Sequence, residues 1–195
     1  MTHSRHKLNP AQSALLVMDF QPFKLRHLPD ADGLLTRTAD AIEFARKKAV
    51  QVAHVWSGYT DLDYATVPDS NRRLLPAIKQ RILHVDVPAS AIHEAVAPQE
   101  GDIVERKTRI GAFARTGLDE QLTNLGVTEL ILTGVFTSST VLSTVRDAAD
   151  KDYQLYVLED CVADPDPAVH DFLIRTVLAT QAKIVASGEL DTLIH

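Results

Sequence analysis

The residues best suited to chemistry in this sequence are two charged side chains that follow apolar runs. Asp19 follows the run SALLVM, and Lys107 ends the run DIVERK. A carboxylate after such a run is costly to desolvate unless a cation pairs with it, and a lysine at a neighbouring strand end would supply that cation. Such a pair can move a proton or stabilise a developing charge. It can equally be a structural ion pair or two separate solvated charges, and the two residues alone do not decide between these interpretations.

A second stretch of chemical interest is the turn GVFTSST, residues 134–140. It follows the apolar run TELIL and precedes a helical pattern, and it carries hydroxyl side chains but no cysteine and no histidine. Backbone amides at the start of a helix opening near Thr137 can stabilise a developing negative charge. Thr137 and Ser138 can also cap that helix, and the two roles are compatible.

The elements that must position these residues alternate along the chain. Runs typical of buried strands occupy residues 13–20, 50–56, 102–109, 128–134, 153–160 and 182–187. Helical patterns lie between most of them, for example at residues 33–50, 116–126, 137–152 and 167–181. This alternation predicts a three-layer, doubly wound α/β fold with a mainly parallel six-stranded sheet and helices on both faces. Ligands bind outside the carboxyl ends of the strands in such a sheet, where Asp19, Lys107 and the turn are expected.

One region departs from the alternation. Residues from about 57 to 100 hold turn signals such as VPDSNRR and DVPAS and no strong periodic pattern. We expect a single domain over residues 1–195 in which this region forms an irregular excursion over one end of the sheet.

Composition excludes several classes of protein. The net charge of −6 gives no general basic surface for nucleic acid. The apolar runs are too short for a secretory signal or a transmembrane helix. Cys161 is the single cysteine, which excludes an intrachain disulfide. The sequence therefore predicts a cytoplasmic protein with neither nucleic acid nor membrane as a partner.

Several motifs, in this order, resemble the isochorismatase-like hydrolase family, which includes nicotinamidases and other small-amide hydrolases. They are Asp-x-Gln after the first strand, a lysine with a later Ala-Phe, Gly-Val-x-Thr before a helix, and Arg-Asp-Ala inside that helix. The similarity covers most of the chain and is weakest at about residues 57–100. The resemblance implies a Rossmann-like six-stranded sheet, a small-molecule substrate and assembly into a homo-oligomer, a dimer or larger.

The resemblance also implies a catalytic site. Amidohydrolases of the family use an Asp, Lys and Cys triad; Asp19 and Lys107 match the first two, and the cysteine position falls on Thr140. An internal threonine hydroxyl is far harder to deprotonate than a thiol. Isochorismatases proper lack this cysteine and hydrolyse a vinyl ether with the aspartate as acid. We therefore expect a hydrolase with Asp19 as acid/base, Lys107 as electrostatic partner and water as nucleophile, while Thr140 orients that water or shapes the pocket.

Two alternatives stay open. In the first, the protein is an amidohydrolase whose nucleophile is Thr140, through an ester intermediate. In the second, it is a catalytically inactive member of the family that binds a ligand or serves in assembly. Cys161 lies after a different strand, and we expect a buried structural role for it.

Further site residues are expected near the same strand ends, around the catalytic centre. The turn expected to hold an oxyanion comprises Val135, Phe136 and Ser139, and relatives imply a cis peptide bond at Val135-Phe136. The expected substrate pocket is lined by Gln21, Phe23, Trp56, Phe113 and Phe136. An aromatic pocket suits a planar or ring-bearing substrate, and the expected substrate is a small uncharged or anionic metabolite.

We expect neither a metal ion nor an organic cofactor. Nicotinamidases bind a divalent ion through an aspartate and paired histidines soon after the second strand. The corresponding stretch here offers Asp61 and Asp63 but no histidine before His84. No glycine-rich nucleotide-binding motif follows the first strand either.

Overall fold

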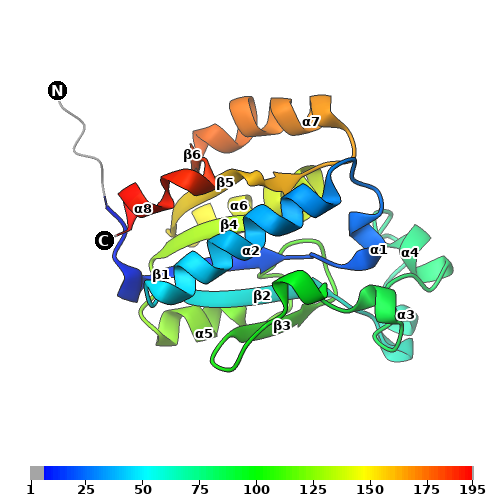
Figure 1. Ribbon diagram of the computed structural model, residues 1–195. Helices are drawn as coiled ribbons and strands as arrows, with labels where there is room; N and C mark the ends of the chain where they lie inside the picture. Colours follow the sequence, from blue (N-terminus) through cyan, green and yellow to red (C-terminus); the bar gives the residue numbers. More distant parts are fainter. Residues whose placement is uncertain (1–6, 195) are drawn as a thin grey trace.

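A parallel six-stranded sheet forms the middle layer of the computed structural model, which describes residues 7–194 (Figure 1). The strands are β1 (Ser13–Met18), β2 (Gln51–Ser57), β3 (Ile103–Lys107), β4 (Glu129–Val135), β5 (Gln154–Ala163) and β6 (Lys183–Val185). Their order in the sheet is β3-β2-β1-β4-β5-β6, and every pair is parallel. The strand order reverses between β1 and β4, which makes their carboxyl ends the switch point where ligands bind in such sheets.

Eight α-helices lie within the described residues. They are α1 (Pro22–Leu25), α2 (Ala31–Lys47), α3 (Asp61–Thr66), α4 (Leu75–Lys79), α5 (Leu118–Asn124), α6 (Leu142–Ala149), α7 (Pro167–Phe172) and α8 (Leu190–Leu193). π-Helical turns at Thr137–Val141 and Leu173–Val177 adjoin α6 and α7. Short 3-10 turns lie at Pro10–Gln12, Pro88–Ser90, Glu94–Val96, Leu178–Thr180 and Ser187–Glu189.

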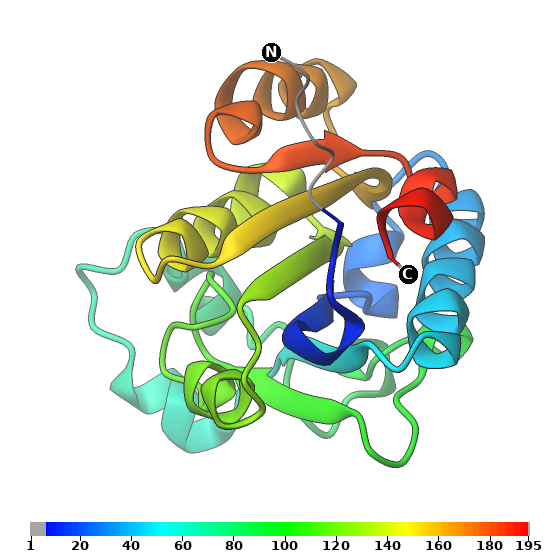
Figure 2. The same ribbon diagram turned by 90° about the vertical axis from the view of Figure 1, so that its left-hand side faces the viewer.

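Helices cover both faces of the sheet, which confirms the predicted three-layer α/β fold (Figure 2). Leu15 and Val17 of β1 pack in the same core cluster as buried residues of α2 and α8. Leu16 and Met18 point the other way, into the cluster that contains residues of α5 and α6. Both faces of β1 are therefore buried, which explains why its sequence is continuously apolar rather than alternating.

Two helices have boundaries that differ from the sequence prediction, one because of a capping side chain and one because the helix type changes along its length. Helix α2 starts at Ala31 because the side chain of Asp30 caps it, accepting a hydrogen bond from the amide of Gly33 at 3.1 Å. The helix expected over residues 167–181 begins as α7 and continues as a π-helical and then a 3-10 turn.

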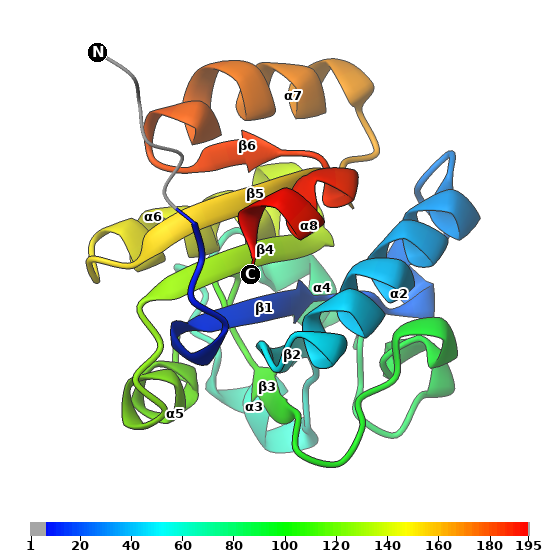
Figure 3. The same ribbon diagram turned by 60° about the vertical axis from the view of Figure 1, so that its left-hand side comes forward.

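The first and last described segments meet where Leu8 pairs with Ile194 (Figure 3).

The region between β2 and β3 forms only short helices and turns. Helices α3 and α4 lie beyond the carboxyl ends of the central strands (Figure 1). Tyr59, Tyr64, Val67 and Leu74 form a small apolar cluster there, separate from the two main cores. The ring of Tyr64 stacks on that of Tyr59 with centroids 5.6 Å apart.

No helix among the described residues is long and apolar enough to span a bilayer.

Gly134 allows β4 to approach β1 closely beside the site. Its φ is +154°, and an added Cβ would lie 2.8 Å from the carbonyl oxygen of Met18. We predict that Gly134→Ala lowers the free energy of unfolding by about 1–3 kcal/mol, because the methyl group must push β1 and β4 apart. Urea denaturation measures this change.

The matched control is Gly188→Ala, because an added Cβ there meets no atom within 4 Å. That substitution should change the unfolding free energy by no more than about 0.5 kcal/mol. Equal effects of the two substitutions would contradict a tight contact at Gly134.

Candidate active site

Asp19 sits at the carboxyl end of β1 in an uncommon backbone conformation. Its φ is 63°, in the left-handed region that side chains other than glycine rarely adopt. The strand therefore ends at Met18, earlier than the apolar run suggests. The amide of Asp19 donates to the carbonyl of Val55 at 2.8 Å, and the residue is only 1% exposed. The surrounding strands thus hold the carboxylate in a fixed, dry position.

Four side chains surround the carboxylate of Asp19. Lys24 Nζ lies 2.6 Å and Lys107 Nζ 2.8 Å from Oδ2. The hydroxyl of Ser57 donates to Oδ1 at 2.9 Å, and the hydroxyl of Thr140 donates to Oδ2. The structure therefore brings together Asp19, Lys107 and Thr140, the three residues expected to be catalytic, and adds two partners to them.

The two ammonium groups control the ionisation of Asp19. Burial alone would raise the pKa of this carboxyl, but the charges and hydrogen bonds of Lys107 and Lys24 outweigh it and hold the pKa well below its usual range. Burial also lowers the pKa of Lys24 to about 8, against the opposing attraction of Asp19. Near neutral pH, Asp19 is thus a carboxylate, and Lys24 is an ammonium group that can give up a proton readily.

Lys107 is fixed by the chain that follows β3. Its Nζ donates to the carbonyl of Ile110 at 2.6 Å and to the hydroxyl of Thr140 at 3.1 Å, besides contacting Asp19. The residue is only 1% exposed. Its three N–H groups therefore have three strong acceptors, and the ammonium group has little freedom to move.

Lys24 was not singled out from the sequence. It lies on α1, which opens with Pro22 just after the end of β1, so its side chain reaches back over Asp19. Its Nζ also lies 3.0 Å from the hydroxyl of Ser57. The available signal was Pro22, which is favoured at a first helical position and implies an immediate helical turn.

The turn after β4 carries Thr140 to the carboxylate. The Val135-Phe136 peptide bond is cis, as the resemblance implied. The carbonyl of Phe136 accepts from the amide of Ser139 at 3.1 Å. The amide of Ser138 donates to Asp164 at 2.8 Å. These two amides are thus engaged within the protein, which weakens the expectation that Ser139 belongs to an oxyanion-binding turn.

A cavity of about 230 Å³ opens above the carboxylate. Phe23, Phe136 and Ser139 line it, together with Lys24, Lys107 and Thr140. Tyr59, Leu74 and Ile110 extend its wall. The volume and the mixture of apolar and charged groups suit a small metabolite.

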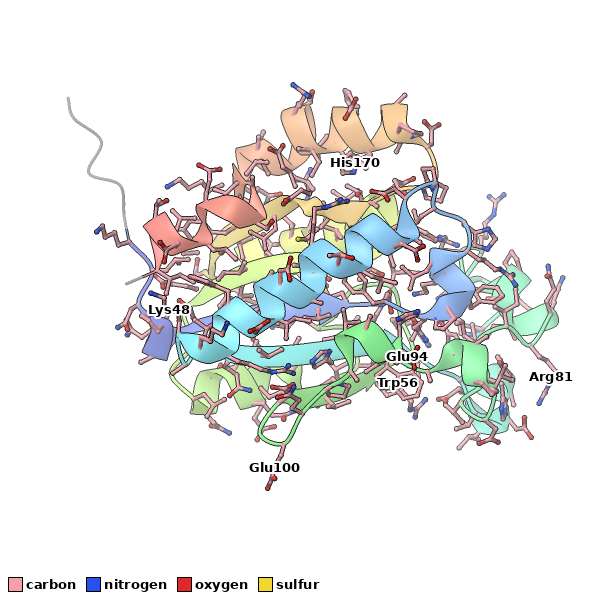
Figure 4. The ribbon with its side chains drawn as sticks, viewed as in Figure 1. Lys48, Trp56, Arg81, Glu94, Glu100 and His170 are labelled. Atoms are coloured by element: carbon pink, nitrogen blue, oxygen red, sulfur yellow. The ribbon has the colours of Figure 1, made fainter. Side chains whose placement is uncertain are left out.

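Three of the residues expected in the pocket lie elsewhere. Gln21 is fully buried and donates to the carbonyl of Ser57 at 2.8 Å, so it braces β2. Trp56 (Figure 4) precedes Ser57 on β2, and because alternate residues of a strand face opposite sides, Ser57 points to Asp19 and Trp56 does not. Phe113 stacks on Tyr153 in the core, with centroids 5.8 Å apart.

Cys161, His54 and His170 lie outside the cavity. Cys161 is buried in a core cluster, where burial raises the pKa of its thiol to about 12. His54 is buried in β2, with Nε2 3.3 Å from Asp102. His170 (Figure 4) contacts the hydroxyl of Thr137 at 2.9 Å. Within residues 7–194, no cluster of three or more His, Cys, Asp and Glu side chains is arranged to hold a metal ion.

Comparison with known proteins places this site in a family. The profile described as "Isochorismatase domain" matches residues 13–189. Ureidoacrylate amidohydrolase RutB of Methylorubrum extorquens is 32% identical over 158 residues, which cover 74% of this chain and 63% of that protein. The phenazine biosynthesis protein PhzD of Pseudomonas fluorescens is 28% identical over 94% of this chain and 86% of its own length.

A solved structure agrees with these matches. An isochorismatase family protein from Burkholderia thailandensis superposes with a TM-score of 0.82 at 26% identity, covering 97% of this chain and 98% of its own. The similarity thus includes the whole sheet and the strand ends that carry Asp19, Lys107 and Thr140. On this domain match, the chain belongs to the isochorismatase family.

Proposed function

We propose that the protein is a hydrolase of a small metabolite in which Asp19 moves the proton, Lys107 holds the carboxylate and a water molecule is the nucleophile. The observation that carries this proposal is the buried carboxylate of Asp19, clamped by Lys24 and Lys107 below a cavity. Burying three charges is costly, and apolar residues of similar volume would often stabilise a fold more. Such a cluster at a switch point is typical of catalysis rather than of stability alone.

Proton movement divides between Asp19 and Lys24. The water oxygen adds to the substrate carbon while its proton passes to Asp19, which is ionised and can accept it. Lys24 gives its proton to the leaving nitrogen of an amide. Asp19 then returns its proton to Lys24 across their 2.6 Å contact, so both groups regain their starting states. In a vinyl ether, Lys24 first supplies a proton through Asp19 to the vinyl carbon; water then adds to the resulting oxocarbenium carbon while its proton returns through Asp19 to Lys24. The hemiketal so formed splits into a ketone and an alcohol as its hydroxyl proton moves to the leaving oxygen.

Two related reactions fit this arrangement. RutB relatives are ureidoacrylate amidohydrolases, which points to an amide-type C–N bond. A Pseudomonas chlororaphis relative, 27% identical over 94% of this chain, bears the name probable isochorismatase, which points to a vinyl ether. Ureidoacrylate and isochorismate are therefore the first substrates to test.

A second candidate uses Thr140 as a covalent nucleophile. The hydrogen bond from its hydroxyl to Asp19 favours this route, because a nucleophile must contact its base. One feature opposes it: Lys107 donates a hydrogen bond to the same hydroxyl oxygen at 3.1 Å, which makes that oxygen a poorer nucleophile. We therefore assign Thr140 to positioning the water and Lys107.

We further propose that the protein works in the cytoplasm as a homo-oligomer. A lone, buried cysteine fits a reducing compartment. Val169 and Phe172 of α7 are 38% and 59% exposed, and they give a second copy an apolar surface to cover.

We predict that Phe172→Glu shifts the protein toward monomer in sedimentation velocity, because a buried carboxylate at the contact is costly. Leu125→Glu, at another exposed apolar position, is the control and should leave the mass unchanged. A wild-type monomer would contradict the oligomer proposal.

Asp19→Asn should lower kcat by about 10²–10⁴-fold for whichever substrate responds, because the amide cannot accept the water proton. Thr140→Ala should reduce turnover by roughly tenfold through a misplaced water. Intact-mass spectrometry of quenched reactions should detect no acyl adduct. Thermal unfolding verifies that both variants are folded. An adduct on Thr140, with complete loss in Thr140→Ala, would establish the covalent route instead.

The dependence of kcat/KM on pH should identify Lys24 as the acid. Lys24 must be protonated, so the rate should fall as pH rises through about 8. Because the pKa of Asp19 lies below its usual range, that carboxylate should stay ionised throughout the neutral region.

In Lys24→Met, kcat/KM should drop by about 10²-fold or more. The basic limb of its pH profile, which is the fall through about pH 8, should disappear. Lys47→Met, which removes an exposed lysine of α2, should keep the wild-type profile. An unchanged basic limb in Lys24→Met would remove Lys24 from the proton path.

A further inference from the structure

The cavity wall is cationic although the whole chain is acidic. Lys24, Arg73, Lys107 and Arg109 line the cavity, and no aspartate or glutamate lines it. Asp19 beneath the floor contributes one negative charge against these four positive ones. The chain as a whole carries a net charge of −6. A concave surface lined by one sign of charge concentrates ligands of the opposite sign.

The two arginines have no carboxylate partner within the described residues. Arg73 reaches from the region before α4 to within 3.5 Å of the Ser139 hydroxyl, beside the turn that carries Thr140. Arg109 follows β3 and donates to the carbonyl of Thr108 at 2.7 Å. Neither forms an ion pair among residues 7–194. By contrast, four other arginines each pair with an aspartate: Arg37, Arg46, Arg81 and Arg106.

We propose that this site selects an anionic substrate, a small carboxylate whose charged end is bound by Arg73 and Arg109. The inference deepens the proposed function and rests on it for the reaction, but not for binding. A planar guanidinium matches a carboxylate with two parallel hydrogen bonds. An anion placed there also relieves the mutual repulsion of the four cations. The susceptible bond would then face Asp19 and Thr140 on the floor.

The remaining walls set the shape of the substrate. Phe23 and Phe136 face the cavity, and Tyr59 lies beside them. Burial raises the pKa of Tyr59 to about 12, although Arg109 acts in the opposite direction, so its hydroxyl is a neutral donor. With a volume of about 230 Å³, the cavity suits a compact, flat carboxylate rather than a long chain.

Equilibrium binding tests this proposal without any turnover. Two matched pairs serve as probes: benzoate against benzamide, and crotonate against crotonamide. In calorimetric titrations at low ionic strength, each carboxylate should bind at least about tenfold more tightly than its amide. Added salt should weaken carboxylate binding and leave amide binding unchanged.

Substitutions locate the anion site. Arg73→Gln and Arg109→Gln should each weaken carboxylate binding by about tenfold without altering amide binding. Arg72→Gln removes an exposed neighbouring arginine that does not line the cavity, and it should leave carboxylate binding unchanged. Equal binding of acids and amides, no carboxylate binding up to millimolar concentration, or equal effects of the three substitutions would each overturn the proposal.

The outcome separates this proposal from the hydrolase itself. Selective carboxylate binding with no hydrolysis of any substrate would support the anion site and contradict the enzyme. Hydrolysis of uncharged amides, with no selective carboxylate binding, would support the hydrolase and contradict the anion site.

Discussion

The ion cluster of Asp19, Lys24 and Lys107 is the constraint on which the rest of this structure depends. The carboxylate is 1% exposed, and the two ammonium groups lie 2.6 and 2.8 Å from one of its oxygens. Removing Asp19 would leave the two buried ammonium groups without a counter-charge, which is far more costly than never burying them. The backbone must therefore bring all three to one point and hold them there. That point is the carboxyl end of β1, beside the switch in strand order, where a parallel sheet also forms its ligand crevice.

Each partner of Asp19 comes from a different element, so the fold as a whole assembles the site. Ser57 ends β2, Lys107 ends β3, Lys24 lies on α1, and Thr140 lies on the turn after β4. Because the pKa of the Asp19 carboxyl is held low, the resting protein carries no proton on this group that could be donated to a substrate. A role for Asp19 as the initial acid, as expected from isochorismatases, then requires a proton relayed from a neighbour. Lys24, with its pKa lowered to about 8, is suited to that relay.

The sheet could be predicted from the sequence because apolar runs are a local pattern. The contact of Asp19 with Lys107 and Thr140 could be predicted because the order of the motifs places all three residues at strand ends. Sequence reasoning missed Lys24, because the direction of a side chain on a one-turn helix depends on tertiary packing. The orientation of Trp56 was also outside its reach. The last residues of a strand can face either side of the sheet, and a shift of one residue exchanges the two faces. The cationic wall was hidden for a related reason: Arg73 comes from a region with no periodic pattern, and its place above the turn is set by the fold.

Direct titration of the Asp19 carboxyl tests the central claim most simply. Carbon-13 NMR of protein labelled at aspartate carboxyls, with the resonance assigned through Asp19→Asn, follows its ionisation from pH 8 to the acid limit of the folded state. A clamp by two ammonium groups predicts that the resonance keeps the shift of an ionised carboxylate well below the ordinary range of aspartate. In Lys24→Met the midpoint should move upward. An Asp19 resonance that titrates at or above the ordinary aspartate value in the wild-type protein would contradict the clamp and the proton path built on it.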